Sequence, residues 1–171
     1  MSIVLVGSTS GSVTLQEPAV AGSTVLDLPA ATGTVMVSGN MPAFSVYNNT
    51  GQSVSTNTTT KCNFNTEEWD TNNNFASSRF TPTVAGYYTF SCNIGFQNSN
   101  TYGTLILYKN GSSSRYLTYA QSSSGALSGS CMDYANGTTD YFEIYINIAA
   151  GQNVNGNSQS GYFQGALIRV A

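Results

Sequence analysis

The fold is decided by the stretch Phe80-Thr-Pro-Thr-Val-Ala-Gly86-Tyr-Tyr88-Thr-Phe90-Ser-Cys92-Asn-Ile94-Gly-Phe96. From Tyr88 to Phe96 every second residue is apolar or aromatic, and the residues between them are polar or small. Side chains alternate between the two faces of a strand, so this pattern predicts a β-strand with one buried face. The Thr-Pro-Thr-Val-Ala-Gly segment is typical of a turn that leads into the strand.

Similar alternating runs follow one another from about Met41 to the end of the sequence, and no amphipathic helix interrupts them. The expected strands are Ala43–Tyr47, Ser53–Asn57, Lys61–Glu67, Phe75–Phe80, Tyr87–Phe96, Thr104–Lys109, Arg115–Ala120, Ala126–Tyr134, Tyr141–Ile148 and Tyr162–Val170. Asn110-Gly111 and Asn136-Gly137 stand between such runs and predict tight hairpin turns. Ten short strands joined by turns predict an all-β, antiparallel sandwich or jelly roll.

The first forty residues have a different organisation. Gly11-Ser12-Val13, Gly22-Ser23-Thr24 and Gly33-Thr34-Val35 recur at a spacing of eleven residues, with Leu15 and Leu26 in the same register. One such strand–turn unit cannot bury its apolar face alone, whereas three chains wound together could. We therefore expect residues 1–40 to form a short β-rich trimeric stalk and residues 41–171 to form the head, a flexible linker being the alternative.

The composition limits the classes of partner. Only 8% of the residues are charged, against roughly 25% in ordinary domains, and amide, hydroxyl and glycine residues replace them. The 12% aromatic content and the regular alternation argue against disorder. Such a neutral surface suits a secreted or a particle-surface protein, and its amides, hydroxyls and rings are able to bind sugars. The net charge is −3 and the five basic residues do not cluster, which excludes binding to nucleic acid or to an anionic membrane surface.

The N-terminus carries a short apolar run, Ile3–Val6, without a basic leader or a long hydrophobic core. We therefore expect no signal peptide, synthesis in a host cytoplasm and no membrane insertion, because no run approaches the ~20 apolar residues of a membrane span. An exposed apolar run of this kind usually meets a partner protein.

Cys62, Cys92 and Cys131 cannot all pair within one chain. Cys92 falls on the apolar face of the decisive strand, which favours a buried, reduced thiol. A Cys92–Cys131 disulfide is the alternative, provided that the strands of these two residues are neighbours. We expect no metal site, since the cysteine spacings are wide and the sequence has no histidine.

The head resembles the C1q/tumour-necrosis-factor-like jelly roll over about residues 42–170. Phe64, Asp70 and Phe75 fit the start of that family's pattern, and Phe80, Gly86, Tyr88 and Phe90 continue it. The sequence departs from the family in two ways: the gap from Phe75 to Phe80 is two residues shorter, and Cys92 replaces an aromatic residue. The resemblance implies a homotrimer.

A narrower resemblance is to the C-terminal heads of phage tail fibres. It rests on Leu26-Asp27-Leu28-Pro29-Ala30, Asn63-Phe64-Asn65-Thr66-Glu67-Glu68 and Asn136-Gly137-Thr138-Thr139-Asp140-Tyr141. It implies a homotrimeric virion protein of the tail, attached through its N-terminus to other tail or baseplate proteins and contacting a host receptor at its far end.

Catalysis is not expected. Without histidine, histidine-based acid–base chemistry and Ser-His-Asp triads are excluded. Glu67, Glu68 and Asp70 form the one carboxylate cluster, and a glycan hydrolase built on them is a minor alternative. The same three residues are a weak candidate for calcium, which takes carboxylate and amide oxygens, but no dedicated calcium loop is visible. No cofactor is expected.

Loop position predicts the receptor contacts. Connections of an antiparallel jelly roll alternate between its two ends, so the turns at Asn110-Gly111 and Asn136-Gly137 are expected near the stalk. The longer polar loops Gln97–Gly103, Gln121–Gly125 and Ala150–Gly161 are then expected at the tip. Loops held on a rigid scaffold often carry binding residues, and amides and aromatic rings suit sugars. The predicted receptor-binding residues are Asn98, Asn100, Tyr102, Gln121, Asn153, Asn155 and Gln159.

The sequence thus favours a trimeric tail fibre or receptor-binding protein that attaches a particle to a host-surface glycan or protein. A purely structural trimerisation or decoration domain without a ligand is the first alternative, and a cell-wall glycan hydrolase is the second. Neither the receptor nor the host follows from the sequence.

Overall fold

The computed structural model describes residues 3–16, 18–20, 22–23, 25, 30, 32–33, 35–98, 101–122 and 125–171, with positions 101 and 120–122 described by their backbone only. The chain divides into two compact units, Met1–Gly33 and Thr34–Ala171. The larger unit holds the head, and the single-turn 3-10 helix η1 (Ser38–Asn40) is part of it.

One layer of the head is a five-stranded antiparallel sheet in the order β12-β9-β15-β3-β6. Its strands are β3 (Ala43–Tyr47), β6 (Thr66–Asp70), β9 (Gly86–Gly95), β12 (Ala126–Ala135) and β15 (Gly161–Val170). The strand predicted from the decisive stretch is β9, at the centre of the sheet between β12 and β15. Neighbours in the sheet are far apart in the sequence, as in a jelly roll.

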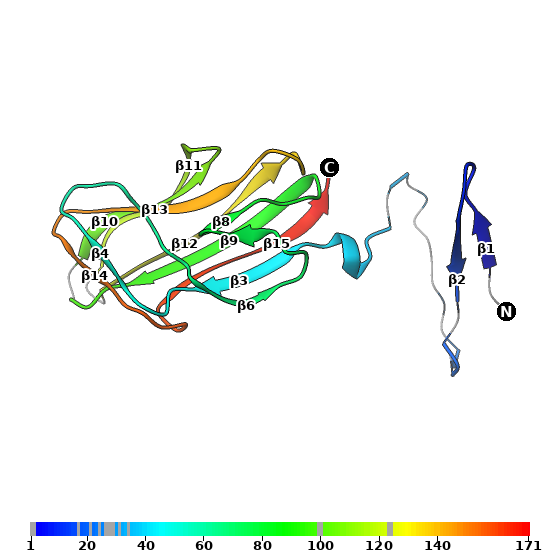
Figure 1. Ribbon diagram of the computed structural model, residues 1–171, viewed down its shortest axis with the longest axis horizontal. Coiled ribbons are helices and arrows are strands. Elements are labelled where there is room, and N and C mark those ends of the chain that lie inside the picture. The colour runs from blue at the N-terminus through cyan, green and yellow to red at the C-terminus, as the bar shows by residue number, and fades with distance from the viewer. Residues whose placement is uncertain are drawn as a thin grey trace. The chain divides into compact units, whose positions relative to one another are not determined.

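The second layer is a six-stranded sheet in the order β11-β10-β13-β8-β7, with β5 also paired to β13 (Figure 1). Its strands are β5 (Thr60–Lys61), β7 (Phe75–Ala76), β8 (Arg79–Phe80), β10 (Thr101–Lys109), β11 (Ser112–Ser122) and β13 (Phe142–Ile148). The predicted hairpin turn between β10 and β11 is confirmed: Asn110 and Gly111 have φ of 53° and 79°, the left-handed conformation that a two-residue turn requires.

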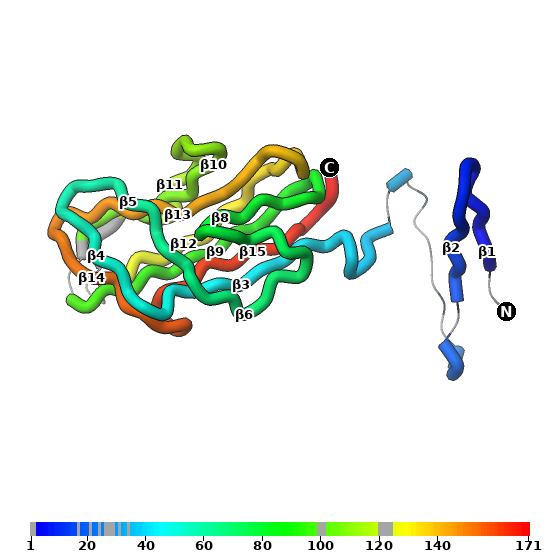
Figure 2. The backbone as a smooth tube through the Cα atoms, viewed as in Figure 1, coloured from blue at the N-terminus to red at the C-terminus, as the bar shows by residue number. Residues whose placement is uncertain are grey.

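The two ends of the head differ. At one end Gly86 pairs with Val170 and Ala135, and the Asn110 amide N–H donates to Tyr141, so both Asn-Gly turns lie there as predicted. At the tip, the opposite end, β4 (Gln52–Val54) and β14 (Gln152–Val154) form a small two-stranded sheet that lies away from the C-terminus in Figure 2. The short β14 is not predictable from alternation, since it has three residues.

The core lies between the two sheets. Tyr88, Phe90, Cys92 and Ile94 of β9 are buried, and so are Phe142, Ile144, Ile146 and Ile148 of β13. Aromatic rings join the layers: Phe44 and Phe80 stack with centroids 4.3 Å apart, and Phe90 lies 4.6 Å from Phe142. The one buried face predicted from the sequence is therefore confirmed on both central strands.

Five predicted strands are wrong in extent. Two are longer than predicted, because β10 begins at Thr101 and β11 runs from Ser112 to Ser122. The other three are interrupted or shortened. Lys61–Glu67 is not one strand, because the Cys62 amide bonds to Ile144 in one sheet and the Asn65 amide bonds to Tyr47 in the other. The segment crosses the edge of the sandwich, and Cys62 and Phe64 keep the alternation because both point into the core. Phe75–Phe80 is a hairpin whose turn residues have positive φ. Ser53–Asn57 shrinks to β4, which ends at Val54.

The predicted hairpin at Asn136-Gly137 is also wrong, because β12 and β13 belong to different sheets. The turn carries the chain across the sandwich, and side-chain bonds hold it. The Asn136 side-chain oxygen accepts bonds from the backbone N–H groups of Thr138, Thr139 and Asp140 at 2.9–3.0 Å. The Asn-Gly pair therefore predicts the position of the turn correctly, but the two strands that it joins do not pair with each other.

All three cysteines are free thiols, which answers the open question of a Cys92–Cys131 bridge. Their strands are neighbours, but Cys92 lies opposite Gly129 and Cys131 lies opposite Phe90. Burial raises the pKa of all three thiols, that of Cys131 to about 11, so they stay protonated near neutral pH. Across the described ranges, no helix has the length and apolarity that a membrane crossing needs.

The N-terminal unit contains a hairpin of β1 (Ile3–Val6) and β2 (Ser12–Leu15). Ile3 pairs with Leu15 and Leu5 with Val13, so one face of the hairpin is entirely apolar and is exposed. A lone two-stranded sheet is only marginally stable in water. The other two copies of the eleven-residue repeat fall partly outside the described residues, and the stalk stays a prediction.

Candidate ligand-binding site

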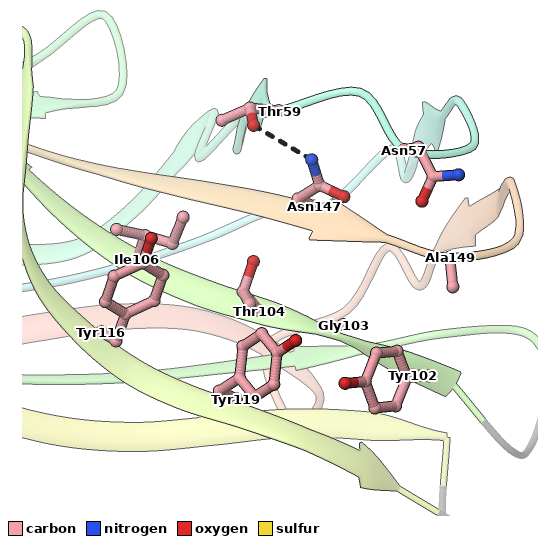
Figure 3. Close-up of a pocket in the computed structure, with 10 residues that line it drawn as sticks. All are labelled: Asn57, Thr59, Tyr102, Gly103, Thr104, Ile106, Tyr116, Tyr119, Asn147 and Ala149. Atoms are coloured by element: carbon pink, nitrogen blue, oxygen red, sulfur yellow. Dashed lines mark hydrogen bonds between the residues drawn. The ribbon is translucent and has the colours of Figure 1, made fainter.

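A groove of about 610 Å³ opens on the outer face of the six-stranded sheet, close to the tip. It lies over β10, β11 and β13 and beside the loop that leads into β5 (Figure 3). Its volume is within the range of roughly 300–1,000 Å³ usual for small-molecule sites. The lining residues are Asn57, Thr59, Tyr102, Gly103, Thr104, Ile106, Tyr116, Tyr119, Asn147 and Ala149.

A β-bulge brings two of the tyrosines onto one face. Tyr119 pairs with Thr104 and Tyr116 with Ile106, although the tyrosines are three positions apart and their partners are only two positions apart. The extra residue of β11 lies where the register shifts between Leu105 and Ile106. Without it, an odd spacing would send the two rings to opposite faces. The bulge is therefore what gives the groove a continuous aromatic wall.

Three exposed rings form this wall. Tyr102, Tyr116 and Tyr119 are 44%, 66% and 68% exposed. The Tyr102 and Tyr119 rings meet edge to face with centroids 5.8 Å apart, and their hydroxyl groups point toward one another in Figure 3. The hydrogen bond with Tyr119 is the largest cause that raises the pKa of Tyr102, and desolvation adds to it. The Tyr102 phenol therefore stays neutral over the physiological range.

The opposite wall is polar. The Asn147 side-chain N–H donates to the Thr59 hydroxyl at 3.1 Å. This bond orients the amide and does not use its oxygen. Asn57 is held by its backbone, which has φ of 50° and donates to Ile148 at 2.7 Å. Among the described hydrogen bonds none uses the Asn57 side chain, which stands beside the groove in Figure 3. This wall offers hydroxyl and amide groups, of which the Asn147 and Thr59 side chains hold each other in place.

Gly103 allows β10 and β13 to approach closely beside the groove. An added Cβ at Gly103 would lie 2.5 Å from the Asn147 backbone oxygen and 2.9 Å from the Ile148 side chain. A larger residue at position 103 would therefore push β10 away from β13 and change the shape of the groove.

No described residue that lines the groove carries a formal charge. The nearest ionic cluster lies farther along the same sheet face. There Lys61 Nζ and Arg79 Nε contact one oxygen of Glu143 at 2.7 and 2.9 Å, and the Glu143 side chain is almost fully buried. Burial alone would raise the pKa of Glu143, but the hydrogen bonds from Lys61 and Arg79 outweigh it and the pKa is lowered.

We expect Glu143→Gln to lower the free energy of unfolding by about 1.5–3 kcal/mol, the usual value of hydrogen bonds to a charged group. Because the folded-state pKa is depressed, this contribution is present above the ordinary glutamate pKa of about 4.3 and is lost as the pH falls through the folded value. Urea unfolding from pH 3 to 7 tests both points. Glu67→Gln, on an exposed residue, is the matched control; equal losses in the two variants would contradict the prediction.

Of the predicted receptor-binding residues whose side chains the structure describes, Tyr102 alone lines the groove. Asn98, Asn153, Asn155 and Gln159 lie at the tip as predicted, but bonds within the tip loops occupy two of the side chains. The Asn153 side chain bonds to Ser53 and Gln97, and the Asn155 amide donates to the Phe96 carbonyl oxygen. Asn100 lies outside the described residues, and Gln121 is described by its backbone only, on β11.

Sequence reasoning missed Tyr116, Tyr119, Asn147, Asn57 and Thr59. Tyr116 and Tyr119 fall within a predicted strand, where the odd spacing hides their common face. The signal that was available is the accumulation of tyrosines between residues 102 and 119 in a chain with few charges.

The carboxylate cluster has structural partners. Glu68 accepts a hydrogen bond from the Ser45 hydroxyl at 2.7 Å, and the Asp70 carboxylate accepts from the backbone N–H groups of Asn72 and Phe75. Within the described ranges, no group of three or more histidine, cysteine, aspartate or glutamate side chains could hold a metal ion.

The outer face of the five-stranded sheet carries exposed apolar side chains. Near the C-terminus Tyr87, Met132 and Ile168 line a hollow of about 450 Å³, and Tyr134 packs against Tyr87. Trp69 overhangs a second hollow of about 240 Å³, whose other walls are small or polar residues of β9 and β15. Exposed apolar groups gathered in this way mark contact surfaces.

No protein-family model matches the sequence, and no curated protein has significant sequence similarity to it. Solved structures do match. Murine APRIL at pH 8.0 matches with a TM-score of 0.59 and 8% identity, covering 75% of this chain and 99% of that one. The globular domain of zebrafish complement 1qA protein matches with a TM-score of 0.51 and 22% identity over 76% and 99%. PRD1 vertex protein P5 matches with a TM-score of 0.51 and 12% identity over 74% and 71%.

At these identities the matches establish the fold. The head is a C1q/TNF-like jelly roll, as the sequence predicted.

Proposed function

We propose that this chain is a homotrimeric viral attachment protein, of the tail-fibre type, that binds a host-surface glycan or protein and does no catalysis. The observation that carries this proposal is the groove: three exposed tyrosines of β10 and β11 face amide and hydroxyl groups of β13 and of the loop before β5. An attachment site needs only to bind its ligand. The described lining residues include no carboxylate, thiol or amine that could serve as a general acid or base.

A place on a virus particle is supported by two independent likenesses. The sequence resembles the heads of phage tail fibres in the segments quoted above, and the fold is shared with PRD1 vertex protein P5. The low charge and high amide content are consistent with a particle surface. On this proposal the protein is made in the host cytoplasm and becomes part of the virion tail.

A homotrimer is supported by the apolar face of the five-stranded sheet. Tyr87, Met132 and Ile168 would be costly to leave in water, and a second copy packed on this face would cover them. Three heads held together would turn a weak contact at each groove into firm attachment, provided that all three grooves can engage at once.

Attachment to other tail or baseplate proteins is assigned to the N-terminal hairpin. Its one apolar face, formed by Ile3, Leu5, Val13 and Leu15, is exposed and requires a partner. The partner is either the equivalent hairpins of the trimer or another tail protein.

A binding site in the groove and a binding site in the tip loops predict different effects of substitutions on cell binding. We expect Tyr119→Ala to weaken binding of the full chain to host cells at least tenfold, the effect of about 1.4 kcal/mol at each site. Gln159→Ala, on an exposed tip-loop residue outside the groove, is the control and should leave binding unchanged. Flow cytometry with labelled protein over a panel of bacterial strains gives the measurement. Loss with Gln159→Ala alone would move the site to the tip loops, and no binding to any strain would favour the purely structural role.

A further inference from the structure

We propose that the ligand of the groove is an uncharged saccharide of at least two units, laid along β10 with sugar rings stacked on Tyr119 and Tyr116. This inference rests on the attachment function proposed above and specifies its ligand. It is carried by the two chemically different walls of the groove, by the lack of charged side chains among its described lining residues and by the spacing of the two tyrosine rings.

The two walls match the two sides of a sugar ring. A pyranose presents polarised C–H groups on its face and hydroxyl groups around its rim. Tyr119 and Tyr116 offer ring faces, whose negative quadrupole attracts such C–H groups. Across the groove, Asn147, Asn57 and Thr59 offer amide and hydroxyl groups, each able to donate and to accept (Figure 3). A purely apolar ligand would leave this polar wall without partners.

The charge distribution selects a neutral sugar over an acidic one. On this sheet face, Lys61 and Arg79 both contact Glu143, at 2.7 and 2.9 Å. Arg115 stands next to Tyr116 on β11, but it lies opposite the buried Leu107, which places its side chain on the other face of the strand. A sialylated or sulfated ligand would bring an anion into a groove whose described lining holds no counter-charge, and desolvating that anion would cost free energy.

The dimensions favour an oligosaccharide over a folded protein. Tyr116 and Tyr119 lie opposite Ile106 and Thr104, which are two residues apart on β10, so the two tyrosines are spaced by roughly 7 Å along the sheet at about 3.3 Å per residue. Each tyrosine has an exposed ring of its own, so the proposed ligand has at least two units, one for each ring. The groove is concave and lies on the face of the sheet, whereas an added peptide strand would pair with an edge.

Chemical treatment of the cells distinguishes the class of ligand even while the particular sugar is unidentified. Cells that bind the full chain are treated with periodate, which cleaves vicinal diols, or with a broad protease, and binding is then measured at 50 and 500 mM NaCl. We expect periodate to remove at least nine-tenths of the binding, protease to leave it intact, and salt to change it less than twofold, because an uncharged contact is not screened.

Variants tie that result to the groove. Tyr119→Ala and Tyr116→Ala should each weaken binding at least tenfold, whereas Tyr119→Phe, which keeps the ring, should weaken it less than threefold. Both tyrosines are largely exposed, so the variants should fold, which circular dichroism verifies. Hydrogen exchange of the unmodified protein provides a second readout, in which soluble saccharide released from the cells should protect peptides from residues 101–119.

The outcomes separate this inference from the function on which it rests. Protease-sensitive, periodate-resistant binding that still depends on Tyr119 overturns the saccharide and leaves attachment in place. A steep loss with salt replaces the neutral sugar with an acidic one and also overturns the inference. Binding that is indifferent to Tyr119 and Tyr116, or no binding to any cell, overturns the proposed function of the groove itself.

Discussion

Ile168→Lys is expected to separate the proposed homotrimer into single chains. Ile168 is 58% exposed on the five-stranded sheet and shares a hollow with Met132, which is 60% exposed. Burying a side chain of this size contributes about 1.5–3 kcal/mol, and a trimer repeats that contribution at each of its contacts. Lysine removes it and places an ammonium group against an apolar surface, which costs more unless it is paired.

Light scattering coupled to size exclusion measures the result. The unchanged protein should have three times the 18.0 kDa mass of one chain, and the variant should have the mass of one chain. Tyr116→Lys is the matched control, because it adds the same charge at a residue that is 66% exposed on the other sheet; it should stay trimeric. A monomeric unchanged protein, or an Ile168→Lys trimer, would remove the case for association through this face.

The fold was predictable because the central strand of each sheet buries one face. Alternation identified β9 and β13, and the conformational demands of Asn110-Gly111 identified the turn between β10 and β11. What alternation cannot report is the partner of a strand. Lys61–Glu67 keeps its period while it passes from one sheet to the other, since both sheets face the same core.

The site was less predictable for a related reason. Tyr102 was found from its place in a polar loop, although it lies within β10. Tyr116 and Tyr119 come together only because β11 has one residue more than β10 in this region, and that difference is a property of the pairing rather than of either strand. The amides of the tip loops looked available for ligands in the sequence. In the structure these amides hold the tip loops together: Asn153 bonds to the side chains of Ser53 and Gln97, and Asn155 donates to the Phe96 carbonyl oxygen.

Phe90→Ala is expected to cost about 3–5 kcal/mol in the free energy of unfolding, the usual range for removing a large aromatic side chain from a core. Phe90 is fully buried at the centre of β9. Its ring lies 4.6 Å from Phe142 on the opposite sheet and 5.9 Å from Phe163 on the neighbouring strand, so its loss leaves a cavity where the two layers meet. Because backbone pairing on both sides of β9 resists collapse into that cavity, we expect a value near the top of the range.

Phe75→Ala is the control, since Phe75 is only half-buried, in the two-residue strand β7 near the end of the six-stranded sheet, and should lose less than half as much. Urea unfolding should be followed at one protein concentration, because association adds a concentration-dependent contribution to stability. The Ile168→Lys background would remove that contribution and give the intrinsic cost. If Phe90→Ala lost no more than Phe75→Ala, the two sheets would not depend on the packing that the alternation in β9 predicts, and the sandwich would need another source of stability.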